Sequence, residues 1–151
     1  MKKYLYIFLF ILSSLNVNAQ IIYRGNSQMT SDIMWVYKNN HLYEGTSNMT
    51  SDIVFSFNGR NIYIGSSNMN SNIVATWYQN KLYRYNSITS SNIVGTYING
   101  KFYHGNSTMT SDILYTYRNN CVYLGNSTMT SDIILRTSAP IHPAVLSFIL
   151  F

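Results

Sequence analysis

The sequence repeats itself every twenty residues, and this period constrains the fold more than any other feature. The nine residues GNSTMTSDI occur twice, letter for letter, at positions 105–113 and 125–133. Six units follow one another without insertion or deletion, and they begin at Ile21, His41, Asn61, Lys81, Lys101 and Cys121. Such a period is typical of one supersecondary unit that is copied and laid against its neighbours.

Four positions of the unit never change. They are a tyrosine, two serines and an isoleucine, represented in the first unit by Tyr23, Ser27, Ser31 and Ile33. A fifth position is glycine in five units and Tyr85 in the fourth, and a sixth alternates between Asp and Asn. A position that accepts both Asp and Asn needs a short hydrogen-bonding side chain and does not need a charge.

Each unit is expected to contain two β-strands of about five or six residues. Its apolar segments are short, rich in aromatic and β-branched residues, and bounded by Asn, Gly and Ser. Pairs such as Asn39-Asn40 and Asn58-Gly59 tolerate positive φ, which predicts tight two-residue turns between strands. The segment Ser-x-Met-Thr-Ser-Asp predicts a second kind of connection. In this corner the hydroxyl and carboxylate groups bond to nearby backbone, and the methionine points inward.

Two all-β architectures fit six such units. In a β-solenoid the units stack and identical residues form ladders about 4.8 Å apart. In an antiparallel meander the tight turns close hairpins, and the sheet curls or splits in two. The strict period favours the solenoid-like stack, because one inserted residue would break every ladder, whereas the tight turns favour the curled meander.

The predicted domain organisation has three parts. Residues 1–19 have the basic start, apolar run and small terminal residues of a secretory signal peptide. The six repeats form a β domain over residues 20–136. Residues 137–151 are apolar and are expected to cap the exposed end of the last repeat, with docking to a partner or a membrane surface as the alternative.

Units of the form Y-x-G-x-S-x-x-x-S-D-I resemble a tandem-repeat family of small exported bacterial proteins. The resemblance covers residues 21–136 and departs from the pattern at Asn72, Asn92 and Tyr85. It implies an exported all-β protein and assigns no activity. A weaker likeness is to the septoil-knot β-repeat proteins, whose Tyr-rich strands also alternate with Ser-containing corners.

Charge and cysteine content narrow the function classes. From residue 20 onward, eight Lys and Arg residues against five Asp and Glu residues leave a net charge of +3, spread evenly along the chain. This is not the basic stripe of a nucleic-acid-binding protein, so no nucleic-acid partner is expected. Cys121 is the only cysteine, which excludes an internal disulfide and suggests a surface thiol or an intermolecular bridge.

No motif predicts catalysis, so the chain is not expected to be an enzyme. No cofactor, metal site or catalytic residue is expected. The histidines His41, His104 and His142 stand at positions that do not repeat, and the invariant serines serve all six corners alike. The Asp/Asn column could in principle line up for calcium, although a hydrogen-bonded corner is the better interpretation. Binding residues are not identified by any motif.

One region breaks the repeat symmetry. The position of Trp35 and Phe55 shrinks to Ala75 and Gly95 in the central units. If it faces outward, a dip walled by aromatic residues would suit a sugar ring. If it faces the core, volume exchange explains it, with Trp77 and Tyr85 filling the space.

The sequence therefore predicts an exported protein, periplasmic, at the cell surface or extracellular, with a structural or protein-interaction role. Its expected partner is a cell-envelope protein or a glycan, and the mature chain is expected to have no transmembrane segment. The alternative function is a carbohydrate- or surface-binding module that uses aromatic residues of the central repeats.

Overall fold

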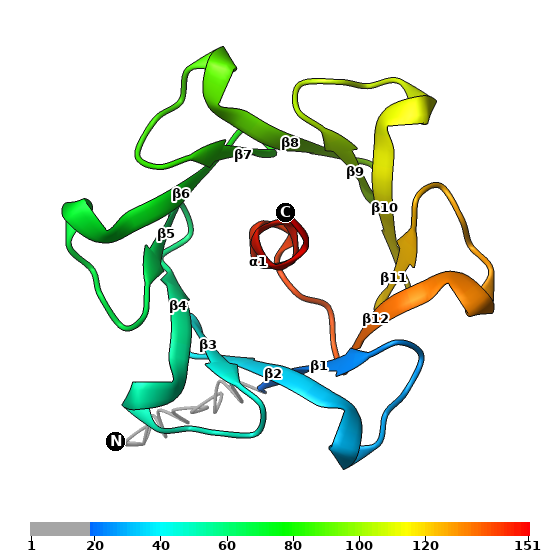
Figure 1. Ribbon diagram of the computed structural model, residues 1–151, viewed down its shortest axis with the longest axis horizontal. Helices are drawn as coiled ribbons and strands as arrows, with labels where there is room; N and C mark the ends of the chain where they lie inside the picture. The colour runs from blue at the N-terminus through cyan, green and yellow to red at the C-terminus, as the bar shows by residue number, and fades with distance from the viewer. Residues whose placement is uncertain (1–18) are drawn as a thin grey trace, which may run out of the picture.

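Twelve short antiparallel strands close into a ring around a central helix (Figure 1). This computed structural model describes residues 19–151, so the signal-peptide prediction lies, except for Ala19, outside the described residues. The first strands of the six repeats are β1 (Gln20–Arg24), β3 (His41–Glu44), β5 (Asn61–Ile64), β7 (Lys81–Arg84), β9 (Lys101–His104) and β11 (Cys121–Leu124). The second strands are β2 (Ile33–Lys38), β4 (Ile53–Phe57), β6 (Ile73–Tyr78), β8 (Ile93–Ile98), β10 (Ile113–Arg118) and β12 (Ile133–Thr137).

The solenoid-like stack favoured by the sequence is wrong, because the strands form a closed barrel. Each strand pairs with its sequence neighbours, and β1 pairs with β12, with Tyr23 opposite Arg136, to close the ring. The turn residues explain this outcome. Asn39 and Asn40 have φ values of 51° and 64°, which give a tight turn that can only join antiparallel strands. The strand order follows the chain all the way round, so the likeness to knotted β-repeat proteins does not extend to the path of the chain.

A bulge in every repeat bends the sheet toward closure. Between β1 and β2, Ile22 lies opposite Trp35 and Tyr23 opposite Ile33, which leaves Met34 as an extra residue. The Met34 carbonyl accepts a hydrogen bond of 2.8 Å from the Gly45 N–H of the next repeat. The same shift recurs in the other five repeats. Bulges increase local twist and bend the strand, so one per repeat distributes the curvature evenly.

The corner segments project from the ring as six petals, defined as residues 25–32 and their counterparts at each interval of twenty (Figure 1). Each contains a 3-10 turn, namely η1 (Thr30–Asp32), η2 (Thr50–Asp52), η3 (Asn70–Asn72), η4 (Ser90–Asn92), η5 (Thr110–Asp112) and η6 (Thr130–Asp132). In the second petal, Ser47 Oγ accepts from the Met49 N–H at 3.1 Å and donates to Asp52 Oδ2 at 2.5 Å. In the third petal Asn72 Nδ2 instead donates to Ser67 Oγ, at 2.7 Å. The prediction that hydrogen bonds fix the corner, without a need for charge, is confirmed.

The inner and outer faces of the barrel wall differ in how much their residues vary between repeats. Strand residues that point into the barrel are buried and vary between repeats: Ile22, Leu42, Ile62, Leu82, Phe102 and Val122. Their neighbours point to the opposite face, because side chains alternate along a strand, and these are the invariant tyrosines. On this outer face the Thr96 hydroxyl donates to the Gly105 carbonyl at 2.7 Å, and Ser56, Thr76 and Thr116 do the same in their repeats. The invariant residues therefore build the petals, and the variable residues line the barrel.

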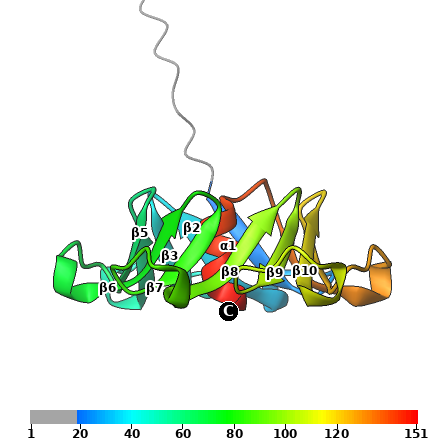
Figure 2. The ribbon, with the colours of Figure 1, turned by 90° about the horizontal axis from the view of Figure 1, so that it is seen from above.

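Helix α1 (Pro143–Leu150) fills the interior, and Figure 2 shows it standing inside the ring. Ala144, Val145 and Leu146 have no exposed surface and pack in one cluster with the inward strand residues. The expected cap on a last repeat is thus wrong, since a closed ring has no last edge to cover. The apolar tail is instead the central part of the core.

The barrel has two different ends. The turn end carries the five hairpin turns, the start of β1 and the start of the helix. The petal end carries the petals and the C-terminus, which lies level with them in Figure 2. No helix among residues 19–151 is long and apolar enough to cross a membrane.

Candidate functional site

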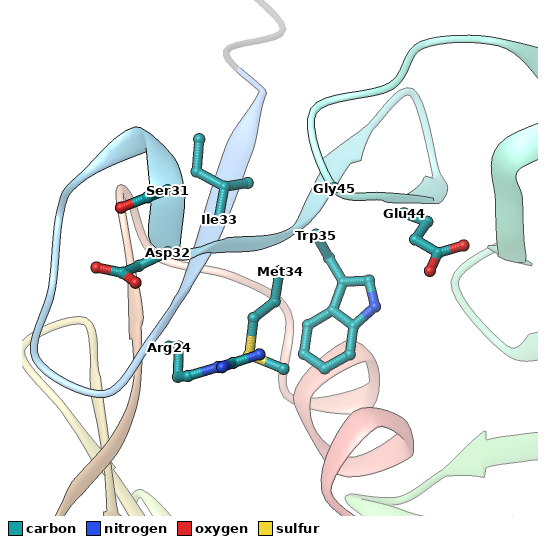
Figure 3. A pocket seen from close by; sticks show the side chains of 8 residues that line it. All are labelled: Arg24, Ser31, Asp32, Ile33, Met34, Trp35, Glu44 and Gly45. Carbon is teal, nitrogen blue, oxygen red and sulfur yellow. The ribbon is translucent and has the colours of Figure 1, made fainter.

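The petal end of the barrel has several hollows. A hollow of about 310 Å³, here called the Trp35 hollow, lies between the first two petals (Figure 3). It is lined by Arg24, Ser31, Asp32, Ile33, Met34, Trp35, Glu44 and Gly45. A second hollow of about 330 Å³ lies across the helix, against Ala75 and Phe151. The Trp35 hollow is the candidate binding site, because it combines an aromatic ring with charges of both signs.

Three adjacent strands position the Trp35 hollow. Arg24 ends β1, Trp35 lies on β2, and Glu44 ends β3. In Figure 3 the Arg24 side chain extends toward Met34 and Trp35, and Glu44 stands on the other side of Trp35. Trp35 also borders a third hollow of about 200 Å³, so the indole separates two open spaces. This arrangement can stack on a flat ligand and can hydrogen-bond it through a guanidinium and a carboxylate group.

The sequence carries a signal for this site that no local motif reveals. The place of Arg24 is taken by Glu44, Ile64, Arg84, His104 and Leu124 in later repeats. Around the ring, only the gap between Arg24 and Glu44 is flanked by opposite charges, and the strand between these two residues carries Trp35. The strand pairing is needed to see this, because β2 pairs with both β1 and β3 and so places Arg24 and Glu44 on the two sides of one site.

The central symmetry break at Ala75 and Gly95 is not an outward dip. Both residues are buried in the barrel, and a Cβ atom on Gly95 would lie 2.6 Å from Cζ of Phe151. Volume exchange is therefore the correct explanation, but the space is filled by Phe151 after the helix and not by Tyr85. Tyr85 fills nothing, since it is 68% exposed, whereas Trp77 faces inward and its ring lies 6.0 Å from that of His142.

The close approach of Gly95 and Phe151 predicts that substitutions at these two positions are energetically coupled. We expect Gly95→Ala to lower the free energy of unfolding by about 1 kcal/mol, because the new methyl group overpacks the core against Phe151. In a Phe151→Ala background the same change should cost clearly less, because the obstructing ring is gone. Urea unfolding of the four proteins measures the coupling. Phe148→Ala is the matched control background, since that ring packs on Phe55, and additive effects in the Phe151→Ala cycle would contradict the assignment.

The titratable residues do not assemble a reactive site. The three histidines lie on β3, on β9 and at the N-cap of α1, where Nδ1 of His142 accepts from the Ala144 N–H at 3.1 Å. Burial lowers the pKa of His41 and of His142. Burial raises the pKa of Tyr37 to about 12, so this phenol stays protonated at neutral pH. Among residues 19–151, no cluster of three His, Cys, Asp or Glu could hold a metal ion.

Two expectations about sulfur-containing residues are wrong. Cys121 is not a surface thiol, because it is buried at the start of β11. The petal methionines do not point inward: Met29, Met49, Met69, Met109 and Met129 are 61–64% exposed. In the fourth petal Ile88, next to the methionine position, is 51% exposed. Every petal therefore presents at least one large apolar side chain to solvent.

The fold defines a class of protein in which six two-stranded petals close into a barrel around the chain's own C-terminal helix. A family model described as "6-fold beta flower protein" matches residues 22–146, and the chain belongs to this family. This agrees with the tandem-repeat β family suggested by the repeat pattern. No match was found among curated proteins or among solved structures.

Proposed function

We propose that this chain is an exported bacterial protein without enzymatic activity, which acts as an interaction module at the cell surface or in the envelope. The observation that carries the proposal is the exposed apolar residue in each of the six petals. A single exposed methionine is ordinary, but the same exposed position repeated around a ring is a surface feature. The proposed partner is a cell-envelope protein that contacts several petals at once.

The chemistry of the petals supports contact rather than catalysis. Methionine is flexible and polarisable, so it adapts to an irregular partner surface. The polar groups of the petal are occupied in holding its shape, as the bonds from Ser47 to Asp52 and from Ser107 to Asp112 illustrate. Serine and carboxylate groups that are engaged in this way are poor nucleophiles or bases.

Photo-crosslinking tests this function directly. The protein, carrying Met34→Leu so that photo-methionine enters the described chain only at the five petals, is expected to crosslink one envelope protein. With that partner purified, replacing all five petal methionines by Gln should weaken binding at least about a hundredfold, because the apolar contacts are lost. The control is Tyr78→Gln with Ile98→Gln, two exposed residues at the turn end, which should bind as the wild type does. Unchanged binding by the five-Gln variant would refute the petal interface.

A second candidate function is glycan binding, and the Trp35 hollow favours it. An indole with open space on two sides and flanking Arg24 and Glu44 side chains suits a sugar ring. The central-repeat aromatics first considered for this role do not suit it, since Trp77 is buried against His142.

The chain offers a direct test of glycan binding because it has only two tryptophans. In a Trp77→Phe variant, Trp35 is the sole indole, so a saccharide that binds in the hollow should change its fluorescence. Adding Glu44→Gln should weaken binding of that saccharide about tenfold, whereas adding Lys38→Gln at the turn end should leave binding unchanged. A glycan that binds equally well after Trp35→Ala would refute this site.

A further inference from the structure

Five of the eight Lys and Arg residues in the described chain lie at one end of the barrel. Lys38 ends β2, Lys101 begins β9, and Arg60 lies in the turn between β4 and β5. Together with Lys81 and Arg118, which also flank turns, they form what is here called the basic turn face. Their side chains are exposed or half-exposed.

The acidic residues lie at the opposite end. The four aspartates occupy petals, and Glu44 ends β3 on the petal side of the ring. The turn face in the described chain thus carries five positive charges and no negative ones, while its turns contain uncharged Asn, Gln and Gly. The charges looked evenly spread in the sequence. An antiparallel meander sorts them, because every second connection lies at the same end.

Two apolar side chains accompany these cations. Tyr78 and Ile98 are 38% and 36% exposed, and they occupy the same repeat position as Lys38 and Arg118. The Arg60 guanidinium lies 5.4 Å from the centre of the Tyr78 ring. Basic residues next to a tyrosine and an aliphatic residue fit the interface between lipid headgroups and acyl chains.

The chain also enters the barrel at this end. β1 starts at Gln20, beside the hairpin turns, where the Ser138 N–H donates to the Ile21 carbonyl. The apolar sequence run at residues 4–12 is therefore joined to the barrel on its basic side.

We propose that the basic turn face docks on an anionic phospholipid surface. Each Lys or Arg held near such a surface strengthens binding roughly fivefold, so five of them give reversible attachment that depends on salt. The petal end then points away from the bilayer. This proposal does not depend on the petal interface, because the two use opposite ends and different residues.

Co-flotation of the exported form of the protein with lipid vesicles tests the proposal. We expect the protein to bind vesicles of phosphatidylcholine that contain about 30% phosphatidylglycerol, and not to bind vesicles of phosphatidylcholine alone. Binding should fall steeply between 50 and 500 mM salt. Lys38→Gln with Lys101→Gln should weaken binding roughly twentyfold. Arg24→Gln with Arg84→Gln removes the same net charge from the petal end and should change binding less than threefold.

Three results would overturn the proposal. Equal binding to neutral vesicles would mean that charge is not recognised. Equal losses in the two charge-matched variants would mean that the turn face has no special role. Tighter binding to double-stranded DNA than to the anionic vesicles, with the same dependence on Lys38 and Lys101, would identify nucleic acid as the ligand of this face.

Discussion

Leu146→Ala should lower the free energy of unfolding by about 3 kcal/mol, and Leu146→Asp should prevent folding. Leu146 has no exposed surface and lies on the helix at the centre of the barrel, where strands from the whole ring converge. Truncation leaves a cavity that short, hydrogen-bonded strands cannot collapse to fill. An aspartate at this position would bury a carboxylate in an apolar core with no partner.

Chemical denaturation followed by circular dichroism measures this effect. Ile98→Ala is the control, since it removes a similar apolar volume from a residue that is 36% exposed, and it should cost less than about 1 kcal/mol. A Leu146→Asp protein that unfolds cooperatively with wild-type stability would show that the barrel stands without its helix, and would contradict the packing described above.

Local features of the fold could be predicted from the sequence because they depend on few neighbouring residues. The turn at Asn39-Asn40 requires positive φ, and the corner at Ser47 and Asp52 is closed by bonds that span only five residues. These turns fix antiparallel pairing, which excludes the stack, but closure of the meander into a ring is not a local property. It depends on how bulge and twist accumulate over six repeats, and no single repeat contains that information.

The role of the invariant residues was misjudged for a related reason. In the predicted stack, identical residues of successive repeats would have formed ladders. In the barrel the interior surrounds one helix, which has no sixfold symmetry, so residues such as Phe102 and Gly95 must differ from their counterparts. Each petal has the same surroundings, as the recurring bond from its first N–H to the preceding repeat shows, and so the petals can keep the same residues six times.

The candidate site was missed because it is formed by three successive strands of two repeats. Arg24 and Glu44 are twenty residues apart, at the same position of two repeats, and no motif connects them. Pairing of β2 with both β1 and β3 brings them to the two sides of Trp35. The same meander explains why the basic turn face could not be read from net charge.

Tyr63→Ala should destabilise the protein by about 3 kcal/mol, although this ring does not face the barrel interior. Tyr63 is 6% exposed, is paired with Ile73 across the strands, and its hydroxyl accepts from Asn58 Nδ2 at 2.9 Å. Its neighbour Ile62 points into the core, so the ring lies on the outer face, at the base of the third petal. Truncation removes the packing that joins petal and wall.

Tyr63→Phe separates packing from hydrogen bonding. It keeps the ring, loses only the bond from Asn58, and should cost about 1 kcal/mol, as measured by the same denaturant titration. Tyr78→Ala is the matched control, because that tyrosine is 38% exposed and its loss should cost less than about 1 kcal/mol. If Tyr63→Ala cost no more than Tyr78→Ala, the invariant tyrosines would not hold the petals, and a different cause would be needed for their sixfold repetition.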